Sequence, residues 1–212
     1  MVEVRSDART QRQRVVDAIQ GGILDGTLKP GEPLRQIPLS KQYEVSQSVI
    51  RESLQTLEQY GLVTSATHSG FLVREFTRDD LVDAYRVREV LEGLAARLCC
   101  RKASRDDVDQ LRDMASRIHQ LSGTGSRAER SELEYQFHQR FLEISGNGTL
   151  QRVSIGFRFV GNLVVTDRDA DEILAEHLAV VDAIADNHPD QAEQLARLHV
   201  ARSAESIVEH QA

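Results

Sequence analysis

The stretch VSQSVIRESLQTLEQYGLV, Val45–Val63, constrains the fold of this chain more than any other. Read as a helix that starts near Ser46, it separates apolar from polar residues at three- and four-residue steps. The apolar residues need a core, whereas the polar ones form a compact hydrogen-bonding surface with one cation, of a kind that a DNA major groove accepts. The apolar face holds Ile50, Leu54 and Leu57, and the polar face holds Gln47, Ser48, Arg51 and Gln55.

The segments on either side of this helix complete a set of elements. Ser6 can cap a first helix, which has an apolar stripe and ends at Gly26. The turn-forming sequence GTLKPGEPL and a short helix around Leu39–Tyr43 follow. The two β-prone pieces LVTSA and GFLVREF then flank residues 67–70. Three helices and a two-stranded hairpin are the parts of a winged helix-turn-helix, so residues 1–76 are predicted to form a DNA-binding domain of this type.

The rest of the chain, residues 77–212, predicts an all-α antiparallel bundle. Thr77 can cap a helix whose first turn carries Asp79 and Asp80 at the positive end of the helix dipole. Short breaks follow, the clearest being SGTGS at 122–126, and loops this short favour antiparallel neighbours. The expected helices span about 78–101, 104–121, 128–145, 148–166, 170–186 and 189–209.

Composition and charge restrict the class of protein without excluding DNA as a partner. No apolar run approaches the length of a membrane span, and the N-terminus lacks the apolar core of a signal peptide. We therefore expect a cytoplasmic protein with no membrane partner. The net charge is −7, but residues 1–76 hold nine basic and nine acidic residues. That part is neutral and can carry a local basic patch.

The two cysteines are adjacent, at Cys99 and Cys100, inside a helical pattern. They cannot form an ordinary disulfide framework, which fits a reducing compartment. We interpret them as small packing residues rather than as a redox site.

An arginine interrupts the apolar face of the first helix of the bundle. Arg88 falls within the stripe that contains Leu91 and Leu98, and a buried arginine needs a partner. Glu92, one turn further on, can be that partner. The functional alternative is an anionic ligand such as a carboxylate, held bidentately.

Four residues of the bundle suit a metal ion. Glu134 and His138 lie four residues apart on one side of a helix, although a simple contact between the two is a common alternative. His177 and His199 lie on apolar faces of two later, consecutive helices. A lone histidine there is usually a core residue, but three histidines and one carboxylate suit a divalent ion such as Zn²⁺, Ni²⁺ or Mn²⁺.

The N-terminal segment resembles the DNA-binding domain of GntR-type bacterial transcription regulators. The resemblance rests on I-x-x-G-x-L-x-P-G-x-x-L, then V-S-x-x-x-[VI]-R-E-x-L-x-x-L-x-x-x-G-L-V, then G-F-x-V. In this chain the matching residues are Ile23, Gly26, Leu28, Pro30, Gly31, Leu34, Val45, Ser46, Ile50, Arg51, Glu52, Leu54, Leu57, Gly61, Leu62, Val63, Gly70, Phe71 and Val73.

This resemblance implies which residues contact DNA: Ser46, Gln47, Ser48 and Arg51 on the reading helix, and His68, Ser69 and Gly70 at the wing tip. The alternative for Arg51 is an ion pair with Glu58 or Glu52. The chain departs from the family pattern at Gln47, where arginine is usual, at Val49, where proline is usual, and at Glu44, where a turn glycine is common. Loss of one cation can lower affinity, and Gln47 can instead read an adenine edge.

The C-terminal segment resembles the FCD domain, the effector-binding domain of the FadR subgroup of GntR regulators. The matching motifs are R-x-x-L-E at Arg88–Glu92, F-H at Phe137-His138, G-N at Gly146-Asn147 and H-x-x-[VI]-x-x-A-I at His177–Ile184, followed by a helix with His199. The resemblance implies a divalent metal held by Glu134, His138, His177 and His199. The family usually has aspartate at the first of these positions. It also implies that Arg88 contacts a carboxylate of the effector.

These observations predict a transcription regulator, most simply a repressor, that binds a palindromic operator on double-stranded DNA as a homodimer. A small organic acid, assisted by the metal, would be its effector. The rival function is a metal-dependent enzyme that uses Glu134, His138, His177 and His199, with Glu134 as general base. A third possibility is a regulator whose histidines only pack and which responds to its ligand without metal.

Overall fold

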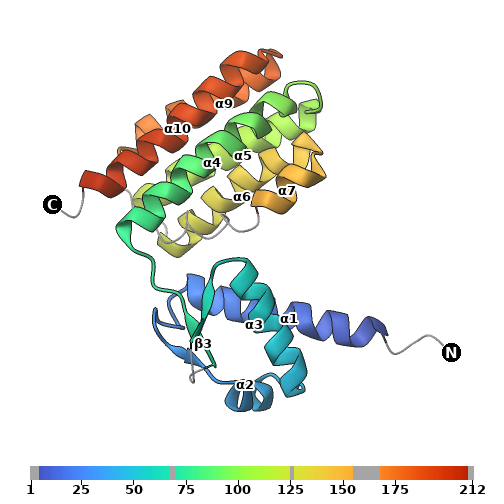
Figure 1. Ribbon diagram of the computed structural model, residues 1–212. Coiled ribbons are helices and arrows are strands. Elements are labelled where there is room, and N and C mark those ends of the chain that lie inside the picture. Colours follow the sequence, from blue (N-terminus) through green and yellow to red (C-terminus); the bar gives the residue numbers. More distant parts are fainter. Residues whose placement is uncertain (1–4, 67–69, 125–126, 155–167, 210–212) are drawn as a thin grey trace. The chain divides into compact units, whose positions relative to one another are not determined.

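The computed structural model describes residues 5–66, 70–124, 127–154 and 168–209, which are mostly helical (Figure 1). The chain divides into two compact units, Met1–Phe76 and Thr77–Ala212. The first contains helices and a small sheet, and the elements described in the second are all helices. This confirms the predicted fold class, a winged helix-turn-helix followed by an all-α bundle.

The core of the first unit forms where α1 (Arg5–Leu24) packs against α3 (Gln47–Gln59). The apolar stripe of α1 supplies one side, and the apolar face of α3 supplies the other. The buried residues are Val15, Val16, Ile19 and Ile23 from α1, and Ile50, Leu54 and Leu57 from α3. Burial of one face leaves Gln47, Ser48, Arg51 and Gln55 on the opposite face of α3 exposed to solvent.

The helix that precedes α3 begins earlier than predicted. α2 spans Gln36–Gln42, whereas the sequence suggested a helix around Leu39–Tyr43. The predicted start was wrong, because Pro38 lies inside the first turn of α2 and the helix begins before it. Proline is tolerated in the first turn of a helix, where the backbone N–H has no intrahelical partner.

A three-stranded antiparallel sheet closes this unit, in the order β1 (Pro33–Leu34), β3 (Gly70–Val73), β2 (Val63–Ala66). The sequence predicted only β2 and β3, and β1 lies in the segment interpreted as a turn. Leu34 is buried and pairs with Phe71, while Pro33 pairs with Leu72 on an edge strand that tolerates proline. The tip between β2 and β3, residues 67–69, lies outside the described residues.

The second unit contains α4 (Arg78–Cys99), α5 (Arg105–Thr124), α6 (Arg127–Ser145), α7 (Gly148–Ser154), α9 (Ala170–Ala185) and α10 (Pro189–Glu209). α4 packs chiefly on α10 and α6, while α5 packs on α9 and α6. Two differences from prediction stand out. α5 continues to Thr124, into the predicted break at 122–126, of which residues 125–126 lie outside the described residues. Of the helix predicted at 148–166, only Gly148–Ser154 lies within the described residues.

Local capping fixes where the bundle begins. The Thr77 hydroxyl accepts a hydrogen bond from the Asp80 backbone N–H, and the Asp80 carboxylate accepts one from the Thr77 N–H. This capping box satisfies backbone donors that the first turn would otherwise leave free. The prediction that Thr77 caps this helix is correct.

The bundle core contains Cys99, which is fully buried and whose thiol donates to the carbonyl of Phe141. Burial raises the pKa of this thiol to about 12, so it is protonated at neutral pH. This agrees with a packing role. Among the described helices, none is long and apolar enough to cross a membrane.

The turn between α2 and α3 holds Glu44 in a left-handed conformation, with φ +55°. Its side chain is exposed. We expect Glu44→Gly to stabilise the protein by about 0.5 kcal/mol, because relief of backbone strain exceeds the extra entropy of the unfolded chain. The midpoint of urea unfolding, followed by circular dichroism, measures this.

Asn187→Gly provides the matched control. Asn187 has the same φ of +55°, but asparagine tolerates this region well, so little gain is expected. A loss of stability in Glu44→Gly would show that the Glu44 side chain contributes more than the strain of its backbone.

Candidate functional site

The N-terminal end of α3 presents its polar residues to solvent. Ser46, Gln47, Ser48 and Arg51 are all exposed. The Ser46 hydroxyl caps the helix: it accepts from the Val49 N–H at 3.3 Å and lies 2.8 Å from the Ser48 hydroxyl. The four predicted DNA-contacting residues of this helix therefore lie on one accessible surface.

Val49 has a local consequence at this helix start. A proline at this position, as the family pattern usually has, would offer no N–H to the Ser46 hydroxyl. Valine supplies the donor, so Ser46 is held as a capping residue before any DNA is bound. Its hydroxyl still has capacity for a phosphate contact, since a hydroxyl both donates and accepts.

Arg51 is not compensated by the acidic residues that were considered as its partners. Glu52 lies 3.9 Å from the Arg12 guanidinium, and Glu58 accepts a hydrogen bond from the Ser65 N–H. Within the described part of the chain, Arg51 forms no ion pair. Its charge is therefore available to a phosphate or a guanine edge.

The predicted wing tip is described only in part. His68 and Ser69 lie outside the described residues. Gly70 is exposed at the start of β3 with φ +78°, a conformation that glycine adopts without strain.

Three histidines meet inside the second unit. His138 comes from α6, His177 from α9 and His199 from α10, and one ring nitrogen of each lies within 4.8 Å of the others. The Nε2 atoms of His177 and His199 are 3.3 Å apart. His177 and His199 are buried, so the group lies in the interior of the bundle.

The spacing of these nitrogens suits a metal ion. Two imidazole nitrogens at about 2.0–2.1 Å from a tetrahedral Zn²⁺ lie roughly 3.3–3.4 Å from each other. The 3.3 Å between His177 and His199 falls in this range. Two buried nitrogens this close also need a proton or a cation between them, because their lone pairs repel.

Two carboxylates set the protonation of this group from outside. Glu92 Oε2 lies 2.8 Å from Nδ1 of His138, and Glu176 Oε2 lies 2.8 Å from Nδ1 of His199. An ionised carboxylate only accepts, so each Nδ1 carries the proton and each Nε2 keeps its lone pair in the neutral ring. That is the form of histidine that binds a metal.

Burial keeps the inner rings neutral. It lowers the pKa of His177 well below its ordinary value, and the neighbouring His199 and His138 lower it further. Burial also lowers the pKa of His199, although the hydrogen bond to Glu176 opposes this. For Glu176, burial raises the pKa, but hydrogen bonds from His199, Arg168 and Arg202 outweigh it and lower the pKa to about 2.

Arg88 is engaged within the protein. Its Nε donates to Oε1 of Glu92 at 2.9 Å, and its Nη2 lies 2.7 Å from the same oxygen. Its guanidinium also lies over the ring of Tyr85 at 4.7 Å. The sequence left two partners open for this buried arginine, Glu92 or an anionic ligand, and in the structure it pairs with Glu92.

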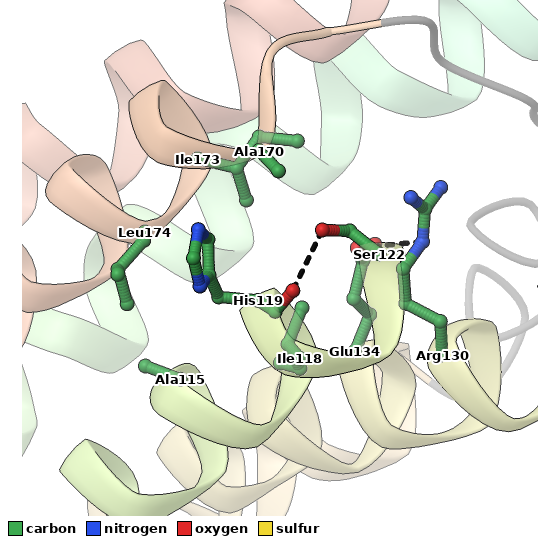
Figure 2. A pocket seen from close by; sticks show the side chains of 9 residues that line it. All are labelled: Ala115, Ile118, His119, Ser122, Arg130, Glu134, Ala170, Ile173 and Leu174. Atoms are coloured by element: carbon green, nitrogen blue, oxygen red, sulfur yellow. Dashed lines mark hydrogen bonds and ion pairs between the residues drawn. The ribbon is translucent and has the colours of Figure 1, made fainter. Parts of the chain in front are cut away.

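Glu134 does not join the three histidines. Among the described residues the metal-type group consists of His138, His177 and His199. Glu134 lies one turn before His138, where its Oε1 is 3.8 Å from Nε of Arg130. Both residues line a small cavity between α5, α6 and α9, where Figure 2 shows them side by side.

Three further side chains around the site were missed or only partly anticipated from sequence. Glu176 and Arg168 were not singled out, and Glu92 was considered only as a partner of Arg88. Glu176 adjoins His177 in the chain but contacts His199, so its role depends on how α9 and α10 pack. No pattern in the sequence could assign that contact.

Comparison with known protein families agrees with these two halves. Residues 83–202, more than half of the chain, match the FCD domain family, and residues 11–73 match the family of bacterial regulatory proteins, gntR family. The chain is a GntR-family regulator with an FCD domain. It is therefore a DNA-binding transcription regulator, and its relatives are regulators rather than enzymes.

The sequence matches between this GntR-family regulator and its relatives extend over both units. The Nta operon transcriptional regulator of Aminobacter aminovorans is 29% identical, over 85% of this chain and 87% of that protein. The probable D-xylose utilization operon transcriptional repressor of Paenarthrobacter nicotinovorans is 29% identical, over 91% of this chain and 86% of that protein. Among solved structures, E. coli McbR/YncC has a TM-score of 0.77 at 18% identity, over 95% of this chain and 99% of that one, which supports the fold.

The low pKa of Glu176 predicts an acid-sensitive contribution to stability. Its folded pKa of about 2 lies below the ordinary 4.5, so the contribution is present above pH 4.5 and is lost as the pH falls toward 2. We expect the wild type to lose more stability than Glu176→Gln between pH 5 and pH 3. Urea unfolding at both pH values measures the difference, and equal losses would contradict the assignment.

Proposed function

We propose that this GntR-family regulator represses its target genes by binding a palindromic operator as a homodimer, and that a small organic acid, assisted by a divalent metal, releases it. The observation that carries the proposal is the presence in one chain of two sites. One is a reading helix with an arginine that forms no ion pair among the described residues, and the other is a cluster of three imidazoles inside the bundle.

The DNA contacts are assigned to α3 and to the wing. Gln47 and Arg51 would reach base edges in the major groove, while the hydroxyls of Ser46 and Ser48 would contact phosphates. At the wing, His68, Ser69 and Gly70 would contact the DNA backbone. A homodimer places two such heads on two half-sites, which accounts for a palindromic operator.

The effector and metal are assigned to the second unit. His138, His177 and His199 would hold Zn²⁺, Ni²⁺ or Mn²⁺, with Glu134 as a fourth ligand once its side chain turns from Arg130 toward the histidines. Sites left open on the ion would accept a carboxylate of the effector. The repressor role is supported by the named role of the D-xylose operon relative.

Effector binding can change operator affinity only if the effector binds the DNA-bound and released states with different strength. The three histidines of the cluster come from α6, α9 and α10, so an effector bound to an ion held there would act on three helices together. This gives the bundle a means to respond to a molecule that contacts few side chains.

Removal of the Arg51 charge should weaken operator binding. We expect Arg51→Ala to lower affinity for DNA from the region upstream of its own gene by about 10–100-fold. The slope of log affinity against log salt should fall by about 0.9 if the contact is to a phosphate. Gel shifts over a series of salt concentrations measure both.

Arg86→Ala is the matched control for this experiment. Arg86 is an exposed arginine of α4, in the other unit, and it pairs only with Asp83 at 2.8 Å among the contacts described. Its loss should leave binding unchanged. If Arg51→Ala also bound DNA like the wild type, α3 would not be the reading helix that we assign.

Removal of the metal should destabilise the protein. A ligand at about 100 times its Kd stabilises the folded state by about 2.7 kcal/mol, so EDTA treatment should lower the melting temperature and added Zn²⁺ should restore it. Elemental analysis of the purified protein identifies the ion. An unchanged melting temperature after EDTA would reject the metal centre.

Two histidine variants separate ligation from packing. His199→Gln should abolish the response to EDTA, whereas His119→Gln should retain it. His119 lies outside the cluster, where its ring contacts Asp171 at 2.7 Å. Glu134→Gln tests the fourth ligand, since a ligating carboxylate that loses its charge binds the ion more weakly.

A further inference from the structure

Two chains of side-chain contacts run from arginines through a glutamate to a histidine of the cluster. The first is Arg88–Glu92–His138, and the second is Arg168 and Arg202–Glu176–His199. We propose that Glu92 and Glu176 are positioning residues of the metal centre, and that Arg88 serves this centre rather than the effector. The proposal rests on the metal centre of the proposed function.

The first series of contacts, Arg88–Glu92–His138, joins α4 to α6 and is buried along its length. The side chains of Arg88, Glu92 and His138 are only 12%, 9% and 12% exposed. Glu92 uses one oxygen for the arginine and the other for the imidazole, at 2.7–2.9 Å in each case. Glu92 therefore cannot turn toward His138 or away from it without breaking the contact to Arg88.

The second series of contacts, from Arg168 and Arg202 through Glu176 to His199, joins α9 to α10 and reaches the surface. Glu176 Oε1 accepts from Arg168 and from Arg202, each at 2.5 Å, and its Oε2 faces Nδ1 of His199. Arg168 is 9% exposed, whereas Arg202 is 47% exposed. As in Glu92, one carboxylate oxygen of Glu176 contacts arginine and the other contacts an imidazole, although the helices and residues are different.

This repeated arrangement performs two tasks for a metal ion. Each carboxylate holds the proton on Nδ1, so that Nε2 carries a lone pair, and each fixes the rotation of the ring. The arginines keep the carboxylates ionised and immobile, against the cost of burying their charge. Loss of such an outer partner typically lowers metal affinity about 10–100-fold.

The arrangement also accounts for Arg88. Two of its nitrogens contact one oxygen of Glu92, and its face is covered by the Tyr85 ring. To bind an effector carboxylate it would have to leave Glu92 ionised and buried without its cation. An arginine without such a partner could bind an effector carboxylate at no such cost. The contacts of Arg88 therefore favour a role in holding Glu92 against His138.

His177 differs from the other two histidines. Its Nδ1 is buried and has no hydrogen-bond partner among the described residues. It relies on packing against Phe137, whose ring centroid lies 4.3 Å from its own. Two of the three rings are therefore aimed by charge-assisted contacts, and the third is held by its neighbours.

The test uses the full chain, freed of metal and titrated with Zn²⁺ against a competing chelator. Glu92→Gln and Arg88→Met should each lower Zn²⁺ affinity by about 10–100-fold. Arg140→Met is the matched control: it removes another partly buried arginine pair of the same unit, with Asp107 at 2.6 Å, which touches none of the three histidines. It should lower the melting temperature and leave Zn²⁺ affinity unchanged.

A second measurement does not depend on metal. Imidazole ¹⁵N shifts of the metal-free protein should show the Nδ1-protonated form at His138 and His199, and Glu92→Gln should change this at His138 alone. Glu176→Gln should do the same at His199, which keeps the proposal testable if a variant of Glu92 does not fold.

The outcomes distinguish failure of the metal centre from failure of the positioning roles. A wild-type protein that takes up no Zn²⁺ overturns the metal centre and the positioning roles together. A wild type that binds Zn²⁺, with Glu92→Gln, Arg88→Met and Glu176→Gln binding it equally well, overturns the positioning roles alone. Affinity lost in these variants but not in Arg140→Met supports them.

Discussion

The need to satisfy three imidazoles inside an apolar bundle shapes the whole second unit. Buried polar groups require partners, and for Nδ1 of two of the three rings the partner comes from another helix. Glu92 on α4 meets His138 on α6, and Glu176 on α9 meets His199 on α10. The close packing of α4 on α6, and of α9 on α10, therefore does more than bury leucines, because it sets the directions in which the nitrogens of His138 and His199 point.

Helical periodicity carried most of the prediction from sequence. The 3.6-residue repeat placed Ile50, Leu54 and Leu57 of α3 in a core, and the cap at Ser46 placed the start of that helix. It also selected His177 and His199, because each lies on an otherwise apolar face, and it selected His138 by its four-residue spacing from Glu134. These are local regularities, and local regularities can be read from a single chain.

Contacts between distant segments were beyond such reasoning. Spacing grouped Glu134 with His138, but the direction of the Glu134 side chain depends on Arg130 and the neighbouring helices. Glu92 reaches the same histidine from a helix far earlier in the chain. β1 was missed for a related reason, since Pro33 and Leu34 become a strand only because β3 lies beside them.

The pairing of both outer carboxylates with arginines has a consequence for the charge of a bound ion. Glu92 is balanced by Arg88, and Glu176 is balanced by Arg168 and Arg202, so neither has negative charge to spare. Neutral imidazoles add none. With Glu134 as the proposed fourth ligand, a divalent ion among these three rings would still retain one net positive charge in a largely buried site, where Coulomb attraction is strong. Such an ion selects for anions at its open positions, so a preference for acidic effectors would follow from electroneutrality, even without an arginine dedicated to recognising them.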